Sequence, residues 1–186
     1  DLVQMSMIDT WAATGAGSYS LSENGLYTLE GWRAFINTLN GNGVFTVSRW
    51  FNPDDVKETG RMIGLATAAL LDMGVSDARP HLFVARANRI ATLVLSKSPF
   101  TNEQLVVLKD EVQRLGFNVL LAPDQPPETA ILAGMIASTD IDSLNVVASS
   151  ALLDLTVPTD NRPFFFNQLR FSNIPGVMMD LAAGGT

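Results

Sequence analysis

The sequence predicts an α/β protein with a mixed sheet, and three observations support this class. The first fifty residues alternate between an apolar strand, a loop of small residues, an amphipathic helix and a second strand. Two further strands are predicted at residues 81–87 and 90–96, with only Asn88 and Arg89 between them, a spacing typical of an antiparallel hairpin. Hydrophobic residues make up 47% of the chain and charged residues only 17%, which suits a sheet buried by helices on both faces.

The first strand is predicted at residues 2–7, a nearly continuous apolar run that ends just before Asp9. Residues 10–22 are rich in glycine, serine and threonine, and such a loop can approach a ligand closely. In α/β folds, ligands bind at the carboxyl ends of the strands. Asp9 is therefore the first candidate for a functional residue, with a role as a turn-capping residue as the alternative.

Helices are predicted before and after the second strand in the sequence. Residues 27–39 place apolar side chains at helical spacing. The second strand is predicted at residues 44–50, which are β-branched and aromatic-rich. Asn52 and Pro53 then form a strong helix start, and this helix is expected to run to Met73.

The second half of the chain predicts shorter elements. They are a helix from Thr101 to Gly116, a strand at residues 118–121, and helices over residues 128–137 and 144–153. Prolines beyond residue 157 predict an extended segment whose three phenylalanines, 164–166, pack against the sheet. We therefore assign residues 1–157 to one α/β domain and residues 158–186 to an extended tail.

Charge and residue inventory exclude several functions. The net charge is −7, with 12 basic and 19 acidic residues, whereas nucleic-acid binders concentrate positive charge. No window reaches the roughly eighteen apolar residues of a membrane span. Because the chain has no cysteine and a single histidine, disulfides and thiolate or multi-histidine metal sites are excluded. A Ser-His-Asp triad is not expected either, because the residues around the one histidine form no nucleophile elbow. His81 is expected to face solvent at the start of an edge strand.

No metal site is expected from carboxylates alone. Asp54, Asp55 and Glu58 are close in sequence, but they are better explained as the solvated first turn of a helix. Arg49 lies near the end of the second strand, where it could hold a ligand carboxylate. A structural ion pair with an acid such as Asp54 is the favoured alternative.

Several runs of residues together resemble a known family. The runs DLVQMSMID, ENGLY, WRAF and LNGNGVF resemble the second half of spermidine synthase-like proteins, which have the Rossmann-like class I methyltransferase fold. The runs IDTWAAT, SRW and TDNRPFFF look like the bacterial group in which such a domain is joined to membrane-spanning segments. The resemblance covers most of residues 1–98 and returns at residues 159–167.

The resemblance implies the C-terminal half of a mostly parallel, seven-stranded sheet with an antiparallel edge hairpin. The glycine-rich turn for S-adenosylmethionine or decarboxylated S-adenosylmethionine would lie upstream of Asp1. The chain alone is therefore expected to be inactive and to bind neither nucleotide tightly. A homodimer that protects the open strand is one expected arrangement. The resemblance also implies a soluble domain on the cytoplasmic side of a bacterial membrane protein.

Site residues follow from the same resemblance. In the aminopropyltransferases the strand equivalent to residues 2–7 ends in an Asp-x-x-Asp pair, which accepts a proton from the attacking amine and holds the diamine. Ser6 and Asp9 occupy these two positions. A serine cannot act as a carboxylate base, so Asp9 is the catalytic candidate and Ser6 a substrate-binding one.

Three further residues are candidates to line the acceptor pocket beside Asp9, namely Tyr19, Glu23 and Tyr27. For Glu23 the alternative is a helix cap. For Tyr27 the alternative is packing beneath the helix that follows, and this is the favoured interpretation.

The expected function is transfer of an aminopropyl or methyl group from an S-adenosylmethionine-type donor to a small-molecule amine or other acceptor. The alternative is a non-catalytic interaction or regulatory module of a membrane protein, in which Ser6 marks lost catalysis. Half of a nicotinamide-dependent dehydrogenase is a third hypothesis. It ranks last because no catalytic histidine or Tyr-Lys pair can be placed.

Overall fold

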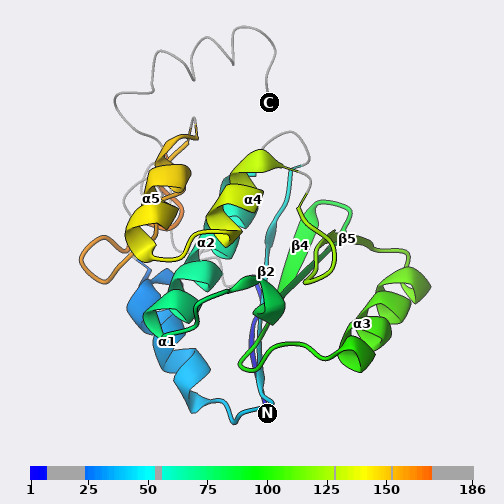
Figure 1. The fold of residues 1–186 in the computed structure, drawn as a ribbon. Helices are drawn as coiled ribbons and strands as arrows, with labels where there is room; N and C mark the ends of the chain where they lie inside the picture. Colours follow the sequence, from blue (N-terminus) through cyan, green and yellow to red (C-terminus); the bar gives the residue numbers. More distant parts are fainter. Residues whose placement is uncertain (8–23, 53–55, 128, 152, 169–186) are drawn as a thin grey trace, which may run out of the picture.

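A computed structural model of the chain describes residues 1–7, 24–52, 56–127, 129–151 and 153–168. In this part of the chain a five-stranded mixed sheet combines with five α-helices, which confirms the predicted α/β class (Figure 1). The strands are β1 (Leu2–Met5), β2 (Val44–Trp50), β3 (Leu82–Ala87), β4 (Ile90–Ser96) and β5 (Asn118–Leu121). Each lies within a residue or two of its predicted position.

The order of the strands is β1-β2-β4-β3-β5. β1 runs parallel to β2, with Leu2 opposite Val44 and Met5 opposite Val47. β4 is antiparallel to both β2 and β3, so β1, β2 and β3 share one direction. The predicted hairpin between β3 and β4 is present, and Asn88 turns it with a φ of 52°.

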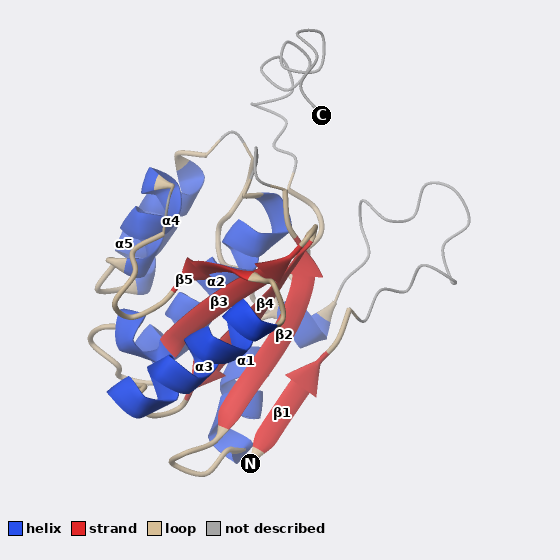
Figure 2. Cartoon of the chain, turned by 90° about the vertical axis from the view of Figure 1, so that its right-hand side faces the viewer, coloured by secondary structure: helices blue, strands red, loops and turns tan. Residues whose placement is uncertain are grey.

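The hairpin does not form the edge of the sheet, and this part of the prediction is wrong. β4 lies between β2 and β3, and β5 pairs with the outer side of β3. The physical reason is the apolar content of β4, whose Ala91, Leu93 and Leu95 are fully buried. A strand of this kind is best accommodated in the interior of a sheet. Figure 2 shows β1 at one edge of the sheet, with α3 in front of the hairpin.

The helices form unequal layers on the two faces of the sheet. One face carries α1 (Leu29–Thr38) and α2 (Lys57–Asp72), while α3 (Asn102–Arg114) covers the other (Figure 1). Two short helices, α4 (Ala130–Ile136) and α5 (Ile141–Ser149), pack against α2. α2 is therefore covered on both sides, which explains why every residue from 59 to 70 is buried.

α1, α3 and α5 begin at side-chain caps, whereas α2 begins at Lys57 without one, later than the start predicted at Asn52 and Pro53. Thr28 caps α1, and its hydroxyl accepts the Gly31 N–H, so the short 3-10 helix Gly25–Tyr27 (η2) stays separate from α1. α3 begins with the predicted capping box of Thr101 and Gln104. α5 begins three residues before its predicted start because Asp140 caps it.

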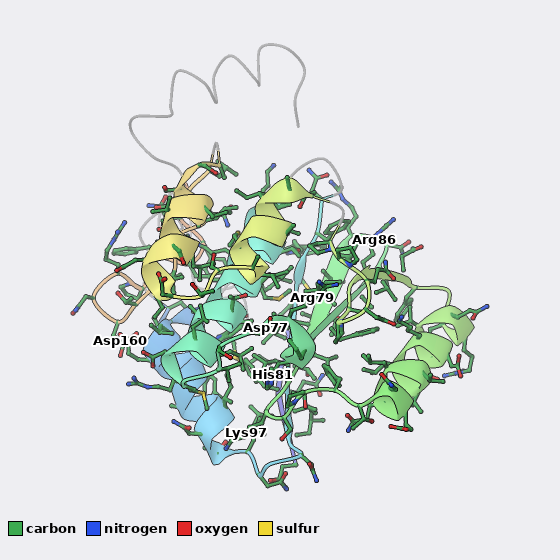
Figure 3. The ribbon with its side chains drawn as sticks, viewed as in Figure 1. Asp77, Arg79, His81, Arg86, Lys97 and Asp160 are labelled. Atoms are coloured by element: carbon green, nitrogen blue, oxygen red, sulfur yellow. The ribbon has the colours of Figure 1, made fainter. Side chains whose placement is uncertain are left out.

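His81 does not face solvent, and that expectation is wrong. It ends a 3-10 helix, Arg79–His81 (η3), and is only 6% exposed (Figure 3). Its Nδ1 lies 2.9 Å from the carbonyl oxygen of Ser96, the last residue of β4. The cause is again strand order, since β3 has a neighbour on each side.

The described part of the tail adds no helix or strand, apart from an isolated bridge between Thr159 and Arg162. It packs onto the sheet domain, and Phe165 is fully buried in the main core. Among the described residues, no helix combines the length and the apolar character needed to cross a membrane.

The cap of α5 predicts a pH effect on stability. The Ser143 N–H donates to the Asp140 carboxylate at 2.7 Å, and this lowers the pKa of Asp140. A lowered native pKa contributes stability above the unfolded value of about 3.9, and that stability is lost as the pH falls through the native pKa. The urea midpoint should therefore fall more between pH 6 and pH 3 in the wild type than in Asp140→Asn, which still caps but does not titrate. Asp142→Asn is the control, and equal falls in the wild type and Asp140→Asn would contradict the prediction.

Candidate functional site

The carboxyl ends of β1 and β2 reach the same edge of the sheet because the two strands are parallel and Met5 is level with Val47. Ser6 follows β1 and is exposed, and its hydroxyl lies 3.4 Å from Nε2 of Gln4. Gln4 is exposed whereas Met5 is buried, so Ser6 lies on the side of the sheet away from the main core.

Three of the predicted site residues, Asp9, Tyr19 and Glu23, lie outside the described residues. Their roles stay predictions.

Tyr27 is completely buried at the end of η2. Its ring centroid lies 4.6 Å from that of Phe165 and 5.4 Å from that of Phe166. Its hydroxyl accepts a hydrogen bond from Nη1 of Arg49 at 3.2 Å. This burial matches the packing interpretation of Tyr27.

Arg49 is the penultimate residue of β2 and only 1% exposed. Side chains alternate between the two faces along β2, so the Arg49 side chain lies on the same face as Phe45 and Val47, the face that α1 and α2 cover. Its guanidinium carbon lies 4.7 Å from the ring centroid of Phe166, a cation–π geometry. The structural ion pair favoured by the sequence is confirmed, with Glu58 as the described partner.

Glu58 lies in the first turn of α2, and its side chain reaches Arg49 near the end of β2. Its Oε2 accepts from Nε of Arg49 at 2.9 Å and from Nη2 at 2.6 Å. The Glu58 side chain remains 26% exposed, in contrast to its buried partner. The arrangement is thus a buried cation whose counter-ion reaches the surface.

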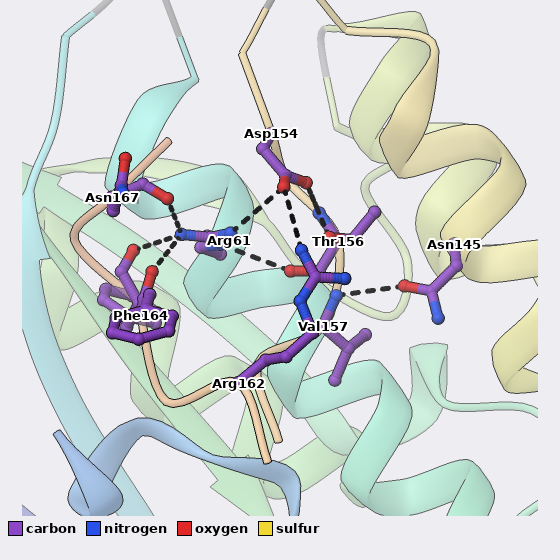
Figure 4. Close-up of polar contacts among 9 residues, drawn as sticks. Arg61, Asn145, Asp154, Thr156, Val157, Arg162, Phe164 and Asn167 are labelled. Atoms are coloured by element: carbon purple, nitrogen blue, oxygen red, sulfur yellow. Dashed lines mark hydrogen bonds and ion pairs between the residues drawn. The ribbon is translucent and has the colours of Figure 1, made fainter. Parts of the chain in front are cut away.

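Arg61, one turn further along α2, forms a second centre that sequence reasoning missed. It is 4% exposed, and its Nη1 donates to the carbonyl oxygens of Phe164, Phe165 and Asn167 at 2.7, 2.6 and 2.8 Å (Figure 4). Its Nε donates to the carbonyl oxygen of Thr156 at 3.2 Å. One side chain therefore satisfies four backbone acceptors, three in the tail and one just before it.

One carboxylate lies between two arginine side chains at this centre. Asp154 lies 3.8 Å from Nη2 of Arg61 and 3.9 Å from Nη2 of Arg162, and it accepts from the hydroxyl of Thr156 at 2.6 Å. The cavity beside these groups measures about 90 Å³. We assign the cluster a structural role, because the contacts of Arg61 hold the chain itself in place.

The signal for Arg61 was present in the sequence. It is a charged residue in the first half of the helix, between Gly60 and the apolar run that begins at Met62. Such a residue is buried only with partners. The hydrogen-bond partners described for it could not be identified from the sequence, because the nearest of them, Thr156, is 95 residues away.

Two backbone hydrogen bonds join the tail to the start of α1. The Asn24 N–H donates to the Pro163 carbonyl at 2.9 Å, and the Leu29 N–H donates to the Pro158 carbonyl at 2.9 Å. The tail is thereby fixed beneath η2, next to the Arg49 cluster formed by Arg49, Glu58, Tyr27, Phe165 and Phe166.

The described residues offer few groups for a metal or nucleotide. They contain no group of three histidine, aspartate or glutamate side chains that could hold a metal ion. Within the same residues, no glycine-rich turn leads from a strand into a helix.

No protein-family model, curated protein or solved structure matches the chain.

Proposed function

We propose that the chain is the C-terminal part of a spermidine synthase-like transferase. The intact protein would use S-adenosylmethionine or decarboxylated S-adenosylmethionine to transfer a methyl or aminopropyl group. The observation that supports this most is the direction of the strands. β1, β2 and β3 run one way and only β4 is reversed among the first four, as expected for the last four strands of such a sheet.

The described residues do not form a cradle for the nucleotide, so the proposal places that cradle upstream of Asp1. The acceptor would bind at the carboxyl edge of β1 and β2, beside Asp9. A carboxylate there can form a charge-assisted hydrogen bond with an amine. Ser6, Tyr19 and Glu23 complete the proposed acceptor site, with Tyr27 beneath it.

A second candidate function is a non-catalytic interaction module, on the cytoplasmic side of a bacterial membrane protein. It is favoured by Ser6, which provides no carboxylate at the position of the base. It is also favoured by β1, an uncharged edge strand on which Leu2 is 59% exposed. An unprotected edge of this kind can pair with another strand, including that of a second copy.

Calorimetric titration tests the transferase proposal. The chain is titrated to millimolar concentrations of S-adenosylmethionine, decarboxylated S-adenosylmethionine and methylthioadenosine. We expect no tight binding to the chain but saturable binding to a polypeptide extended upstream of Asp1. Binding to neither would favour the interaction module. A monomeric mass by light scattering would count against dimerisation through β1.

A further inference from the structure

Glu58 has one carboxylate oxygen occupied and the other open. Both N–H groups that Arg49 contributes go to Oε2, at 2.9 and 2.6 Å. Within the described part of the chain, Oε1 accepts no hydrogen bond. Because the side chain is 26% exposed, the carboxylate can be reached from solvent.

Arg49 fixes the orientation of this carboxylate. Its guanidinium is enclosed by the rings of Tyr27, Phe165 and Phe166, at 5.3, 6.0 and 4.7 Å from their centroids, and it also donates to the Tyr27 hydroxyl. Two hydrogen bonds from a buried, enclosed donor hold Glu58 in one rotamer. A ligand that binds Oε1 therefore avoids much of the entropic cost of ordering a long side chain.

Glu58 lies beside the end of β2, through its contact with Arg49. Its helix follows directly on the carboxyl end of β2, and this edge of an α/β sheet is where ligands bind. β1 ends at the same edge, where the exposed Ser6 follows it. Glu58 supplies a carboxylate near that edge from the first turn of α2, the helix that comes after β2.

The chemistry of the open oxygen selects the class of ligand. An ionised carboxylate oxygen only accepts hydrogen bonds, and it binds N–H donors most strongly when they carry positive charge. The chain's net charge of −7 favours the approach of cations and disfavours anions. A metal ion would need further ligands, and the described residues provide no group of three.

We propose that Glu58, oriented by Arg49, binds the protonated amine end of the acceptor. This rests on the proposed transferase function and identifies a binding residue for its acceptor. Arg49 is a positioning residue, because it contacts the carboxylate and is itself buried.

The test uses the chain labelled with ¹³C at the glutamate carboxyl carbons, with 1,4-diaminobutane as the probe and butane-1,4-diol as its uncharged match. The Glu58 signal is assigned by its loss in Glu58→Gln. We expect the diamine to shift this signal saturably and the diol to leave it unmoved. Glu58→Gln should weaken diamine binding about tenfold or more, the effect of losing a charged hydrogen-bond partner.

Glu103→Gln is the matched control, since it removes one charge from the first turn of α3 on the other side of the sheet. It should bind the diamine within about twofold of the wild type, as expected for an exposed charge far from the ligand. Glu58→Asp keeps the charge but shortens the side chain, and it too should bind more weakly. Thermal melts establish that each variant is folded. If Glu58→Gln is unfolded, the diamine affinity of Glu58→Asp is compared with that of the wild type instead.

Two results would overturn the inference: no shift of the Glu58 signal with the diamine, or equal losses in Glu58→Gln and Glu103→Gln. Nucleotide titration of the wild type reports separately on the proposed function. Nucleotide binding without a Glu58 shift would overturn this inference alone. A Glu58-dependent diamine site with no nucleotide binding in either polypeptide would instead overturn the transferase proposal.

Discussion

Replacing Arg61 with methionine should lower the free energy of unfolding by about 3–5 kcal/mol, the usual effect of removing one partner from a buried ionic network. Methionine fills a similar volume, but it donates no hydrogen bond. Four carbonyl oxygens, that of Thr156 and three in the tail, would lose their donor, and Asp154 would lose its closest described cation. Urea denaturation followed by circular dichroism measures the change.

Arg33→Met is the control for this experiment. Arg33 pairs with Asp72 at 2.9 Å, but its side chain is 47% exposed, so we expect a change within about 0.5 kcal/mol. Arg61→Lys should restore little, because an ammonium group cannot reproduce the planar fork of donors. A loss below about 1 kcal/mol in Arg61→Met would show that the tail is held by other contacts.

Truncating Phe165 to alanine should cost about 3–5 kcal/mol, the range for a fully buried phenylalanine. The ring has no exposed surface and packs against Tyr27 and Phe166, with centroids at 4.6 and 5.2 Å. Its loss would leave a cavity beneath η2 and remove one wall of the enclosure around Arg49. The urea midpoint should fall, and the near-ultraviolet circular dichroism should change because Tyr27 loses its neighbour.

Phe117→Ala provides the comparison. Phe117 is 40% exposed, so its truncation should cost about 1 kcal/mol or less and leave the spectrum unchanged. Equal losses in the two variants would mean that Phe165 is not part of the cooperative core.

Much of the fold could be predicted because its signals are local. β2 is predicted by a run of seven residues of which five are β-branched or aromatic, and α3 by the capping box of Thr101 and Gln104. The order of the strands is not a local property. Nothing within Ile90–Ser96 specifies that β2 pairs on one side and β3 on the other. His81 was wrongly placed at the surface because the sequence does not specify this strand order.

The candidate site was harder to predict for a related reason. Glu58 fits the pattern of a solvated first turn, and only the geometry shows Arg49 on one of its oxygens. Tyr27 and Arg49 are 22 residues apart, and the tail carbonyls bound by Arg61 lie 95 to 106 residues beyond it. Periodicity assigns a buried or exposed position to each residue. It does not identify which distant group a buried charge meets.

The tail hydrogen bonds of Arg61 have a consequence for the order in which the protein folds. During synthesis, α2 leaves the ribosome about one hundred residues before the carbonyls that Arg61 binds. Until then, the guanidinium and the surface beneath η2 lack their final partners. Contacts of this sequence separation form late because their loops are long. The carboxyl edge of the sheet is therefore completed among the last parts of the fold, when the segment that carries Phe164, Phe165 and Asn167 docks.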